Sequence, residues 1–244
     1  MTSSVKLNMV RRRISIEFTL KTLSNKMKQD FDLIVFDWDG TLIDSTGMIA
    51  SSLQSACDDL GFPVPCDTAA RYIIGLGLSD AMRHVLPALP AAEYPRLAER
   101  YRHHFLAHES KLTLFRGAEV LLKRLFEQGY LLAVATGKTR VGLDRGLRKT
   151  GVGGWFGATR CADECFSKPH PAMLKELMEH FAVEPRRTLM VGDTTHDLQM
   201  AANAGCSSVA IAGGAHPRNE LLALEPLACF DAVADLGPWL STGN

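Results

Sequence analysis

The chain lacks an excess of charge of either sign. Its 244 residues include 27 Lys and Arg and 27 Asp and Glu, so the formal net charge is zero. A protein that binds nucleic acid or an anionic membrane through its overall charge carries a basic excess, so we expect neither partner. No apolar run approaches the roughly 18 residues of a membrane-spanning helix, which excludes an integral membrane protein.

Cysteine pairs at metal-binding spacing are also missing. None of the six cysteines forms a Cys-x-x-Cys pair, and no second Cys or His pair at zinc spacing accompanies Cys161 and Cys165. A structural zinc site needs four such ligands, so we do not expect one. We expect buried, reduced thiols and a cytoplasmic location instead. The six are Cys57, Cys66, Cys161, Cys165, Cys206 and Cys229.

The composition that is present is that of a globular protein, with 46% apolar and 22% charged residues. Residues 1–30 stand apart, because basic residues far outnumber acidic ones there. They lack the apolar stretch of a secretory signal. We interpret them as an N-terminal extension that is either a basic, disordered arm or an artefact of the start site, since Met27 closely precedes a buried-strand pattern. We expect no catalytic residue within 1–26.

Short apolar runs alternate with helical patterns over most of the chain. Such runs predict strands of a parallel sheet that helices cover on both faces. The helix before the second strand is expected to bury Val120, Leu121, Leu125 and Phe126, and the next helix Val141. The alternation predicts an α/β fold with a doubly wound, parallel, Rossmann-like sheet. The expected strands are 31–36, 130–135, 157–159, 188–191 and 208–211.

One segment, residues 47–112, interrupts the alternation because it contains helical patterns only. Asp67 and Ser79 are expected to cap two of its short helices. An insert at this point lies over the carboxyl ends of the strands, where open α/β sheets bind ligands. We therefore expect a core domain of residues 31–46 and 113–244 and a helical lid of residues 47–112.

Two aspartates follow the first expected strand. Asp37 and Asp39 are separated by one residue, and Gly40 lets the chain leave the strand, so both carboxylates can approach one centre. One carboxylate can act as a nucleophile and the other as a general acid and base, a division that needs different pKa values. The same residues are also compatible with an Asx turn whose aspartates are solvated.

Three further polar clusters follow later strands. The segment Thr136-Gly137-Lys138 offers a hydroxyl and backbone N–H groups that suit a phosphate oxygen. Lys168 precedes an expected helix and can point at an anion. Asp193 and Asp197 lie four residues apart at a helix entry, where oxygen ligands suit Mg²⁺ rather than zinc. Helix capping or a solvated side chain can explain each cluster alone, but all of them fall at the sheet edge that binds ligands.

Taken together, the four clusters resemble the haloacid-dehalogenase superfamily of phosphohydrolases over about residues 31–236. The insert resembles the C1 cap of that family, and residues 74–78 resemble the cap loop of its phosphoglycolate phosphatase-like members. The matching motifs are Asp37-Trp38-Asp39-Gly40-Thr41-Leu42, Thr136, Lys168 and the segment from Gly192 to Asp197.

The resemblance implies a catalytic role for the aspartates. Asp37 would attack phosphorus and become an aspartyl-phosphate. Asp39 would protonate the leaving oxygen and then deprotonate the attacking water. The cofactor would be Mg²⁺, held by the Asp37 carboxylate, the Asp39 backbone carbonyl and the Asp193 carboxylate, and Asp197 would orient these ligands.

Binding roles follow from the same resemblance. Thr136, Gly137 and Lys168 would bind the phosphoryl oxygens, and Lys168 would also offset the clustered negative charge. The cap would contact the substrate through Arg71, Gly75, Leu76 and Gly77.

The implied function is a Mg²⁺-dependent phosphatase for a small phosphorylated metabolite, with 2-phosphoglycolate as the leading candidate. A phosphatase for another sugar phosphate and a phosphomutase like β-phosphoglucomutase are the alternatives. Thr41 disfavours the mutase, because mutase relatives often carry valine there. Asp39 argues against a dehalogenase, whose members lack the second aspartate. The intact motifs argue against a catalytically silent binding module. The sequence does not distinguish a monomer from a homodimer.

Overall fold

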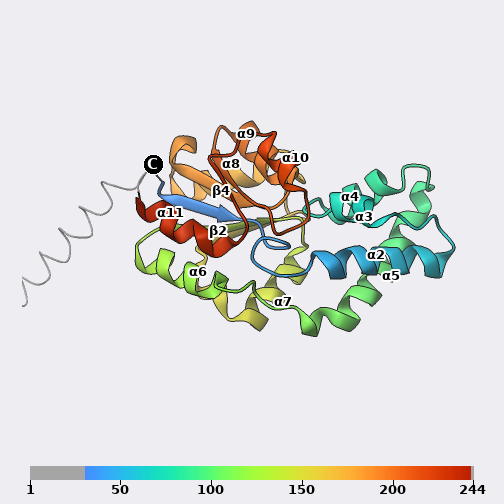
Figure 1. The fold of residues 1–244 in the computed structure, drawn as a ribbon. Helices are drawn as coiled ribbons and strands as arrows, with labels where there is room; N and C mark the ends of the chain where they lie inside the picture. The colour runs from blue at the N-terminus through green and yellow to red at the C-terminus, as the bar shows by residue number, and fades with distance from the viewer. Residues whose placement is uncertain (1–30, 243–244) are drawn as a thin grey trace, which may run out of the picture.

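The computed structural model describes residues 31–242, so the expected N-terminal extension lies outside the described residues. A parallel sheet of six strands is covered by helices on both faces, and further helices project from one end of it (Figure 1). The prediction of a doubly wound α/β fold is confirmed. Across residues 31–242, no helix combines the length and the apolar character needed to span a membrane.

The strand order of the sheet is β3-β2-β1-β4-β5-β6. Phe36 pairs with Val134 of β2 on one side and with Val191 of β4 on the other, so the three central strands end close together. The order reverses at β1, and open α/β sheets bind ligands at the carboxyl ends of strands beside such a reversal. The strands are β1 (Leu33–Phe36), β2 (Leu131–Thr136), β3 (Ala158–Cys161), β4 (Thr188–Gly192), β5 (Ser207–Ile211) and β6 (Ala228–Phe230).

The two edge strands differ from the sequence prediction. β6 is missing from it, because this strand has only three residues and all are half-buried. β3 covers Ala158–Cys161 instead of 157–159, so the strand continues through the charged residue Arg160. The Arg160 guanidinium pairs with Glu176 at 2.6 Å. A search for wholly apolar runs finds central parallel strands but not edge strands such as these.

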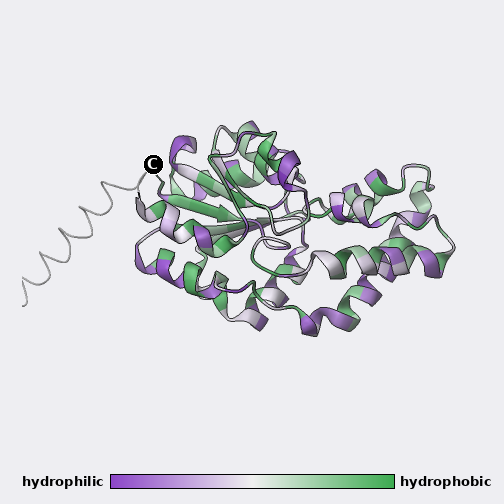
Figure 2. Ribbon diagram, viewed as in Figure 1, coloured by the Kyte–Doolittle hydropathy of each residue, from purple (hydrophilic) through white to green (hydrophobic). Residues whose placement is uncertain are grey.

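The core helices divide between the two faces of the sheet. Ile34 and Phe36 belong to one apolar cluster and Leu33 and Val35 to the other, as the alternation of side chains along a strand requires. The strands are therefore apolar on both faces (Figure 2). The first cluster includes α6 (Ala118–Glu127), α7 (Arg140–Thr150) and α11 (Leu236–Thr242), and the second includes α8 (Ala172–Phe181) and α9 (Thr195–Ala204). The core also contains α10 (Arg218–Leu222), η3 (Val152–Trp155), η4 (Pro185–Arg187) and η5 (Val233–Asp235).

Several side chains that were expected in the core are exposed. Val120 and Phe126 of α6 are 71% and 49% exposed, because the buried face of this helix centres on Leu121 and Leu122. Val141 of α7 is 64% exposed and lines the cavity described below.

The expectation of buried thiols holds for only two cysteines. All six cysteines are free, but Cys57 and Cys161 alone among them are buried, and Cys66 is exposed. Cys66 directly precedes a short helix that begins at Asp67.

The helices between β1 and α6 form a group that we call the helical insert (Figure 1). Leu53, Met82 and Leu97 belong to its own apolar cluster, separate from the two clusters of the sheet. The linkers on either side of the insert run side by side, because Ile43 bridges to Leu114. The helices are α2 (Thr46–Leu60), α3 (Asp67–Tyr72), α4 (Leu78–Val85), η1 (Ala91–Glu93), α5 (Tyr94–His108) and η2 (Glu109–Lys111).

The starts of two insert helices differ from the expected caps. Asp67 is the first residue of α3, and its carboxylate pairs with Arg71 one turn later at 2.7 Å. This pair supports the helix from its side rather than from its end. Ser79 lies inside α4, which begins after Gly77 because the Gly77 N–H donates to Ser167 of the core and so fixes the entry of the chain.

Candidate active site

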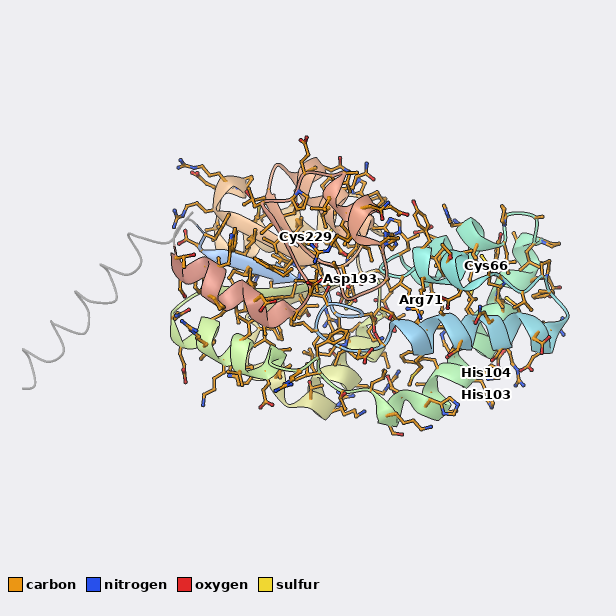
Figure 3. The ribbon with its side chains drawn as sticks, in the orientation of Figure 1. Cys66, Arg71, His103, His104, Asp193 and Cys229 are labelled. Atoms are coloured by element: carbon orange, nitrogen blue, oxygen red, sulfur yellow. The ribbon has the colours of Figure 1, made fainter. Side chains whose placement is uncertain are left out.

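Three carboxylates meet at the carboxyl end of the sheet. Asp37 follows β1, Asp193 follows β4, and Asp197 lies in the first turn of α9. All three are buried, and each offers an oxygen within 4.8 Å of the other two. Figure 3 shows Asp193 where the sheet meets the helical insert. The structure therefore brings together side chains that are up to 160 residues apart in the sequence.

Lys168 lies between two of these carboxylates. Its Nζ is 2.5 Å from Oδ1 of Asp37 and 2.6 Å from Oδ1 of Asp197. Burial lowers the pKa of Lys168, but the charges of Asp197 and Asp37 outweigh burial and raise this pKa, so the lysine remains a cation. One ammonium cannot balance three ionised carboxylates, and the cluster is net acidic.

Asp193 is held by two donors at the centre of the cluster. The Thr41 hydroxyl donates to Oδ1 at 2.7 Å, and the Ala215 N–H donates to Oδ2 at 2.7 Å. Burial, reinforced by the charge of Asp197, raises the pKa of Asp193 to about 7. Gly40 has a φ of 87°, and a Cβ at this position would lie 2.2 Å from Oδ2 of Asp193. Only glycine permits this approach.

The cluster fits a divalent cation. Oδ2 of Asp37 is buried and has no hydrogen-bond partner among the described residues. Burial raises the pKa of Asp37 well above its usual range, and the charges of Asp197 and Asp193 raise it further against the opposing effect of Lys168. A cation would satisfy the free oxygen and offset the excess negative charge. A set of carboxylate oxygens suits Mg²⁺ better than zinc.

Asp197 serves two purposes at once. Its Oδ2 accepts hydrogen bonds from the N–H and the hydroxyl of Thr194 at 3.1 and 2.7 Å, which completes a capping box at the start of α9. Its Oδ1 faces Lys168. The interpretation of Asp197 as a helix cap and its interpretation as a site residue are therefore compatible, because the two oxygens are used separately.

Asp39 is oriented by Lys138, a member of the second polar cluster to whose side chain the sequence analysis assigned no role. Lys138 Nζ lies 3.0 Å from Oδ1 and 2.9 Å from Oδ2 of Asp39, and the Ser45 hydroxyl donates to Oδ1 at 2.7 Å. Lys138 also lies over the ring of Phe105 in the helical insert, 4.7 Å from its centre. The available signal was its position two residues after Thr136 at the end of β2.

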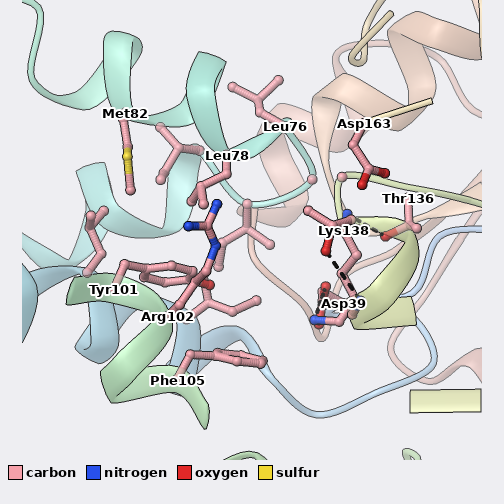
Figure 4. A pocket seen from close by; sticks show the side chains of 18 of the residues that line it. Asp39, Leu76, Leu78, Met82, Tyr101, Arg102, Phe105, Thr136, Lys138 and Asp163 are labelled. Atoms are coloured by element: carbon pink, nitrogen blue, oxygen red, sulfur yellow. Dashed lines mark hydrogen bonds and ion pairs between the residues drawn. The ribbon is translucent and has the colours of Figure 1, made fainter. Parts of the chain in front are cut away.

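A cavity of about 400 Å³ lies between the sheet edge and the helical insert (Figure 4). Asp37, Asp39 and Thr136 line it on the core side, together with Gly137 and Lys138. The opposite wall belongs to the insert and is mainly apolar. A molecule in this cavity would therefore contact the carboxylates with one end and the insert with the other.

Two of the four expected cap residues line this cavity, Gly75 and Leu76. Their loop contacts the core, since a Cβ on Gly137 would lie 2.4 Å from the carbonyl oxygen of Leu76. Arg71 is not among the lining residues. Instead it pairs with Asp67 and donates to the Thr46 hydroxyl at 3.1 Å.

Gly77 does not line the cavity either. Its N–H donates to the Ser167 hydroxyl at 2.7 Å, one residue before Lys168. This bond ties the start of α4 to the loop that carries the buried lysine.

Two histidines of the core hold the insert at one backbone carbonyl. Nε2 of His196 and Nε2 of His216 lie 2.8 and 2.9 Å from the carbonyl oxygen of Tyr72. Because a carbonyl only accepts hydrogen bonds, both imidazoles donate to it. Burial lowers the pKa of His216 and lowers that of His196 to about 4, so both rings are neutral at pH 7. No sequence pattern indicates this contact, which joins three distant segments.

Comparison with known proteins agrees with this geometry. Residues 34–211 match the model of the family described as haloacid dehalogenase-like hydrolase. The chain is 35% identical over 210 residues to the protein named Probable phosphatase IndB of Dickeya dadantii (strain 3937), which covers 84% of the chain and 91% of the relative. It is 30% identical over 218 residues to a phosphoglycolate phosphatase of Vibrio vulnificus (strain CMCP6), covering 86% and 96%.

A solved structure is similar as well. The crystal structure of a predicted phosphoglycolate phosphatase from Haemophilus somnus 129pt matches with a TM-score of 0.76 and 27% identity, over 85% of this chain and 96% of that one. The matched region contains all four polar clusters of the sequence. The resemblance seen in the motifs is thus confirmed: the chain belongs to the haloacid dehalogenase-like hydrolase family.

Proposed function

We propose that this chain is a Mg²⁺-dependent phosphatase that hydrolyses a small phosphorylated metabolite through an aspartyl-phosphate intermediate. The observation that carries the proposal is the state of the Asp37 carboxylate. One of its oxygens is paired with the buried Lys168, and the other is buried without a partner among the described residues. Relatives that align with 84% and 86% of this chain are named phosphatases, which supports the same conclusion.

The metal ligands would be the carboxylates of Asp37 and Asp193 and the backbone carbonyl of Asp39. Asp197 would orient these ligands, because it pairs with Lys168 and is itself fixed by the capping box at the start of α9. When bound, Mg²⁺ neutralises charge on the transferring phosphoryl group and helps to position it. Thr136, Gly137 and Lys168 would bind phosphoryl oxygens.

The reaction would proceed in two displacements at phosphorus. In the first, an oxygen of Asp37 bonds to phosphorus while the bond to the leaving oxygen breaks, and Asp39 gives its proton to that oxygen. In the second, a water oxygen bonds to phosphorus while the bond to Asp37 breaks, and Asp39 takes a proton from the water. Inorganic phosphate leaves, and Asp37 and the protonated Asp39 are restored.

The helical insert would act as the lid of this site and form a domain separate from the core. Residues 47–112 cover the cavity, and the loop of Gly75 and Leu76 contacts Gly137 directly above the sheet edge. Such a cover excludes water during the first displacement and has to open for product release. The contact between Lys138 and Phe105 would then form only in the closed arrangement.

The substrate proposal starts from the relatives. Several of them are named phosphoglycolate phosphatases, so 2-phosphoglycolate is the first compound to test. A relative of Bacillus mycoides (strain KBAB4) with 29% identity is named pyrophosphatase PpaX, so relatives at this distance differ in their named substrates.

The direct test is phosphate release from p-nitrophenyl phosphate and from a panel of small phosphate esters. We expect release with Mg²⁺, loss of release in excess chelator, and loss in the Asp37→Asn variant. Free phosphate rather than an isomerised sugar phosphate distinguishes a phosphatase from a mutase. Turnover that persists in chelator would contradict the metal assignment, and turnover by Asp37→Asn would contradict the covalent mechanism.

A further inference from the structure

The wall of the cavity that belongs to the helical insert is almost entirely apolar. It contains side chains of α2, α4 and α5, and the loop before α4 extends it. The apolar lining residues include Ile49, Leu53, Leu78, Met82 and Phe105. A polar substrate would leave this wall in contact with water, whereas an apolar leaving group would remove both surfaces from water.

The size of the cavity also favours a leaving group larger than that of 2-phosphoglycolate. Its volume of about 400 Å³ falls within the roughly 300–1,000 Å³ of pockets that bind drug-sized ligands. The leaving group of 2-phosphoglycolate has two carbons and fills a small part of such a space. A leaving group has to be larger than this to contact both the core side and the insert wall of the cavity.

Among residues 31–242, one cation at this wall makes no hydrogen bond or ion pair. This cation is Arg102 of α5, an exposed side chain that lines the cavity. The other basic side chains of the lining are engaged, since Lys138 pairs with Asp39 and Arg145 pairs with Glu109 at 2.9 Å each. Arg102 is therefore the lining cation that can receive an anion from a bound molecule.

The position of Arg102 separates it from the phosphoryl site. Figure 4 shows its guanidinium on the insert side of the cavity, beside Leu78 and Tyr101, with Asp39 and Lys138 on the opposite side. An anion bound by Arg102 would belong to the far end of the leaving group rather than to the phosphoryl group.

We propose that the leaving group of the substrate is a ring-sized apolar group that carries a carboxylate, and that Arg102 pairs with this carboxylate. The proposal rests on the proposed phosphatase function and narrows its substrate class. In 2-phosphoglycolate the carboxylate is present but the apolar body is missing. Arg102 acts as a specificity residue that contacts the substrate away from the reacting atoms.

The test compares esters of primary alcohols, so that the reactivity of the leaving group is similar in all of them. We would measure kcat/KM for 3- and 4-carboxybenzyl phosphate, benzyl phosphate and 2-phosphoglycolate with the full chain and Mg²⁺. The better carboxybenzyl ester should exceed both benzyl phosphate and 2-phosphoglycolate by about tenfold or more, since an Arg–carboxylate pair is a charge-assisted hydrogen bond.

Variants assign the preference to one side chain. Arg102→Met should lower kcat/KM for the better carboxybenzyl ester about tenfold. It should change kcat/KM for benzyl phosphate by less than about twofold. Arg102→Lys should restore part of the loss. Arg96→Met is the matched control on the same helix, because Arg96 pairs with Glu93 and does not line the cavity. Arg96→Met should leave kcat/KM unchanged for both substrates.

Leu78→Trp tests the apolar body separately by filling the cavity. It should lower kcat/KM for benzyl phosphate much more than for 2-phosphoglycolate, with an unchanged melting temperature as evidence of folding. A preference of the wild type for 2-phosphoglycolate, or an equal effect of Arg102→Met on charged and neutral esters, would overturn this inference and leave the phosphatase proposal standing. Failure to release phosphate from any ester would instead overturn the phosphatase proposal itself.

Discussion

Lys138 Nζ lies 2.9 Å from Oδ2 of Asp39, so the proposed general acid and base is held between an ammonium and the hydroxyl of Ser45. Lys138 reaches this place from the end of β2, and Phe105 of the helical insert covers it. The relationship links the two halves of the molecule, because a side chain of the core contacts both the site and the insert.

Removal of this lysine should impair turnover without unfolding the protein. Lys138→Met leaves Asp39 with Ser45 alone, and a misplaced acid and base costs part of the roughly hundredfold or greater contribution of such catalysis. We expect kcat to fall at least about tenfold. Lys123→Met is the control, since Lys123 forms only an exposed pair with Glu127. An unchanged kcat in Lys138→Met would show that Lys138 does not position Asp39.

Asp37→Asn should lower kcat by at least about a thousandfold, because a carboxamide is a poor nucleophile. The variant also removes a carboxylate whose pKa is raised by burial, so the metal-free protein should keep or gain melting temperature. Kinetics and thermal unfolding of the same preparation test both statements. A large drop in melting temperature would instead assign Asp37 a structural role.

Magnesium affinity should weaken as the pH falls. Burial raises the pKa of Asp193 to about 7 in the metal-free protein, so this carboxyl binds a proton below pH 7. Magnesium binds the ionised form and has to displace that proton. The apparent Kd should therefore rise roughly fivefold or more between pH 7 and pH 6.

Titration calorimetry in buffers of different ionisation enthalpy measures both the affinity and the released proton. Asp193→Asn should abolish tight binding and the part of the pH dependence that comes from this carboxyl, while Asp37, whose pKa burial also raises, keeps the remainder. Equal affinity at pH 6 and pH 8 would show that Asp193 is not a ligand or does not carry the proton.

Gly137→Ala tests the contact between the core and the insert loop. The added methyl group would lie 2.4 Å from the carbonyl oxygen of Leu76, so the loop has to move away from the site. We expect a loss of about 1–3 kcal/mol of stability from overpacking, together with a lower kcat/KM. Gly154→Ala is the matched control, because a Cβ there meets no atom within 4 Å. Wild-type behaviour of Gly137→Ala would mean that the loop closes without this contact.

The sheet and the cluster of carboxylates could be predicted from the sequence for one physical reason. Central parallel strands are apolar on both faces, and their carboxyl ends meet at one edge, so the side chains that follow them are neighbours. For this reason, Asp37, Asp193 and Asp197 each place a carboxylate oxygen within 4.8 Å of the other two. The edge strand β6 has no such signature, because its residues are only half-buried.

The contacts of the insert could not be predicted in the same way. The bonds of His196 and His216 to the Tyr72 carbonyl and the place of Arg102 in the cavity depend on how the insert sits on the core. The hydrophobic periodicity of the sequence does not predict how the insert packs on the core. The helix starts at Asp67 and Leu78 also differ from the expected caps, and a hydrogen bond from the Gly77 N–H to Ser167 of the core fixes the entry into the second of these helices.

The most direct test of the central claim is a crystal structure of the protein with Mg²⁺ and beryllium fluoride, which mimics a phosphoryl group on a carboxylate. We predict the fluoride complex on an oxygen of Asp37, with the Mg²⁺ bound by Asp37, Asp193 and the backbone carbonyl of Asp39. The cavity lined by Thr136 and Lys138 should enclose it. Binding of the fluoride complex at another side chain, or a cation that avoids Asp37 and Asp193, would contradict the account.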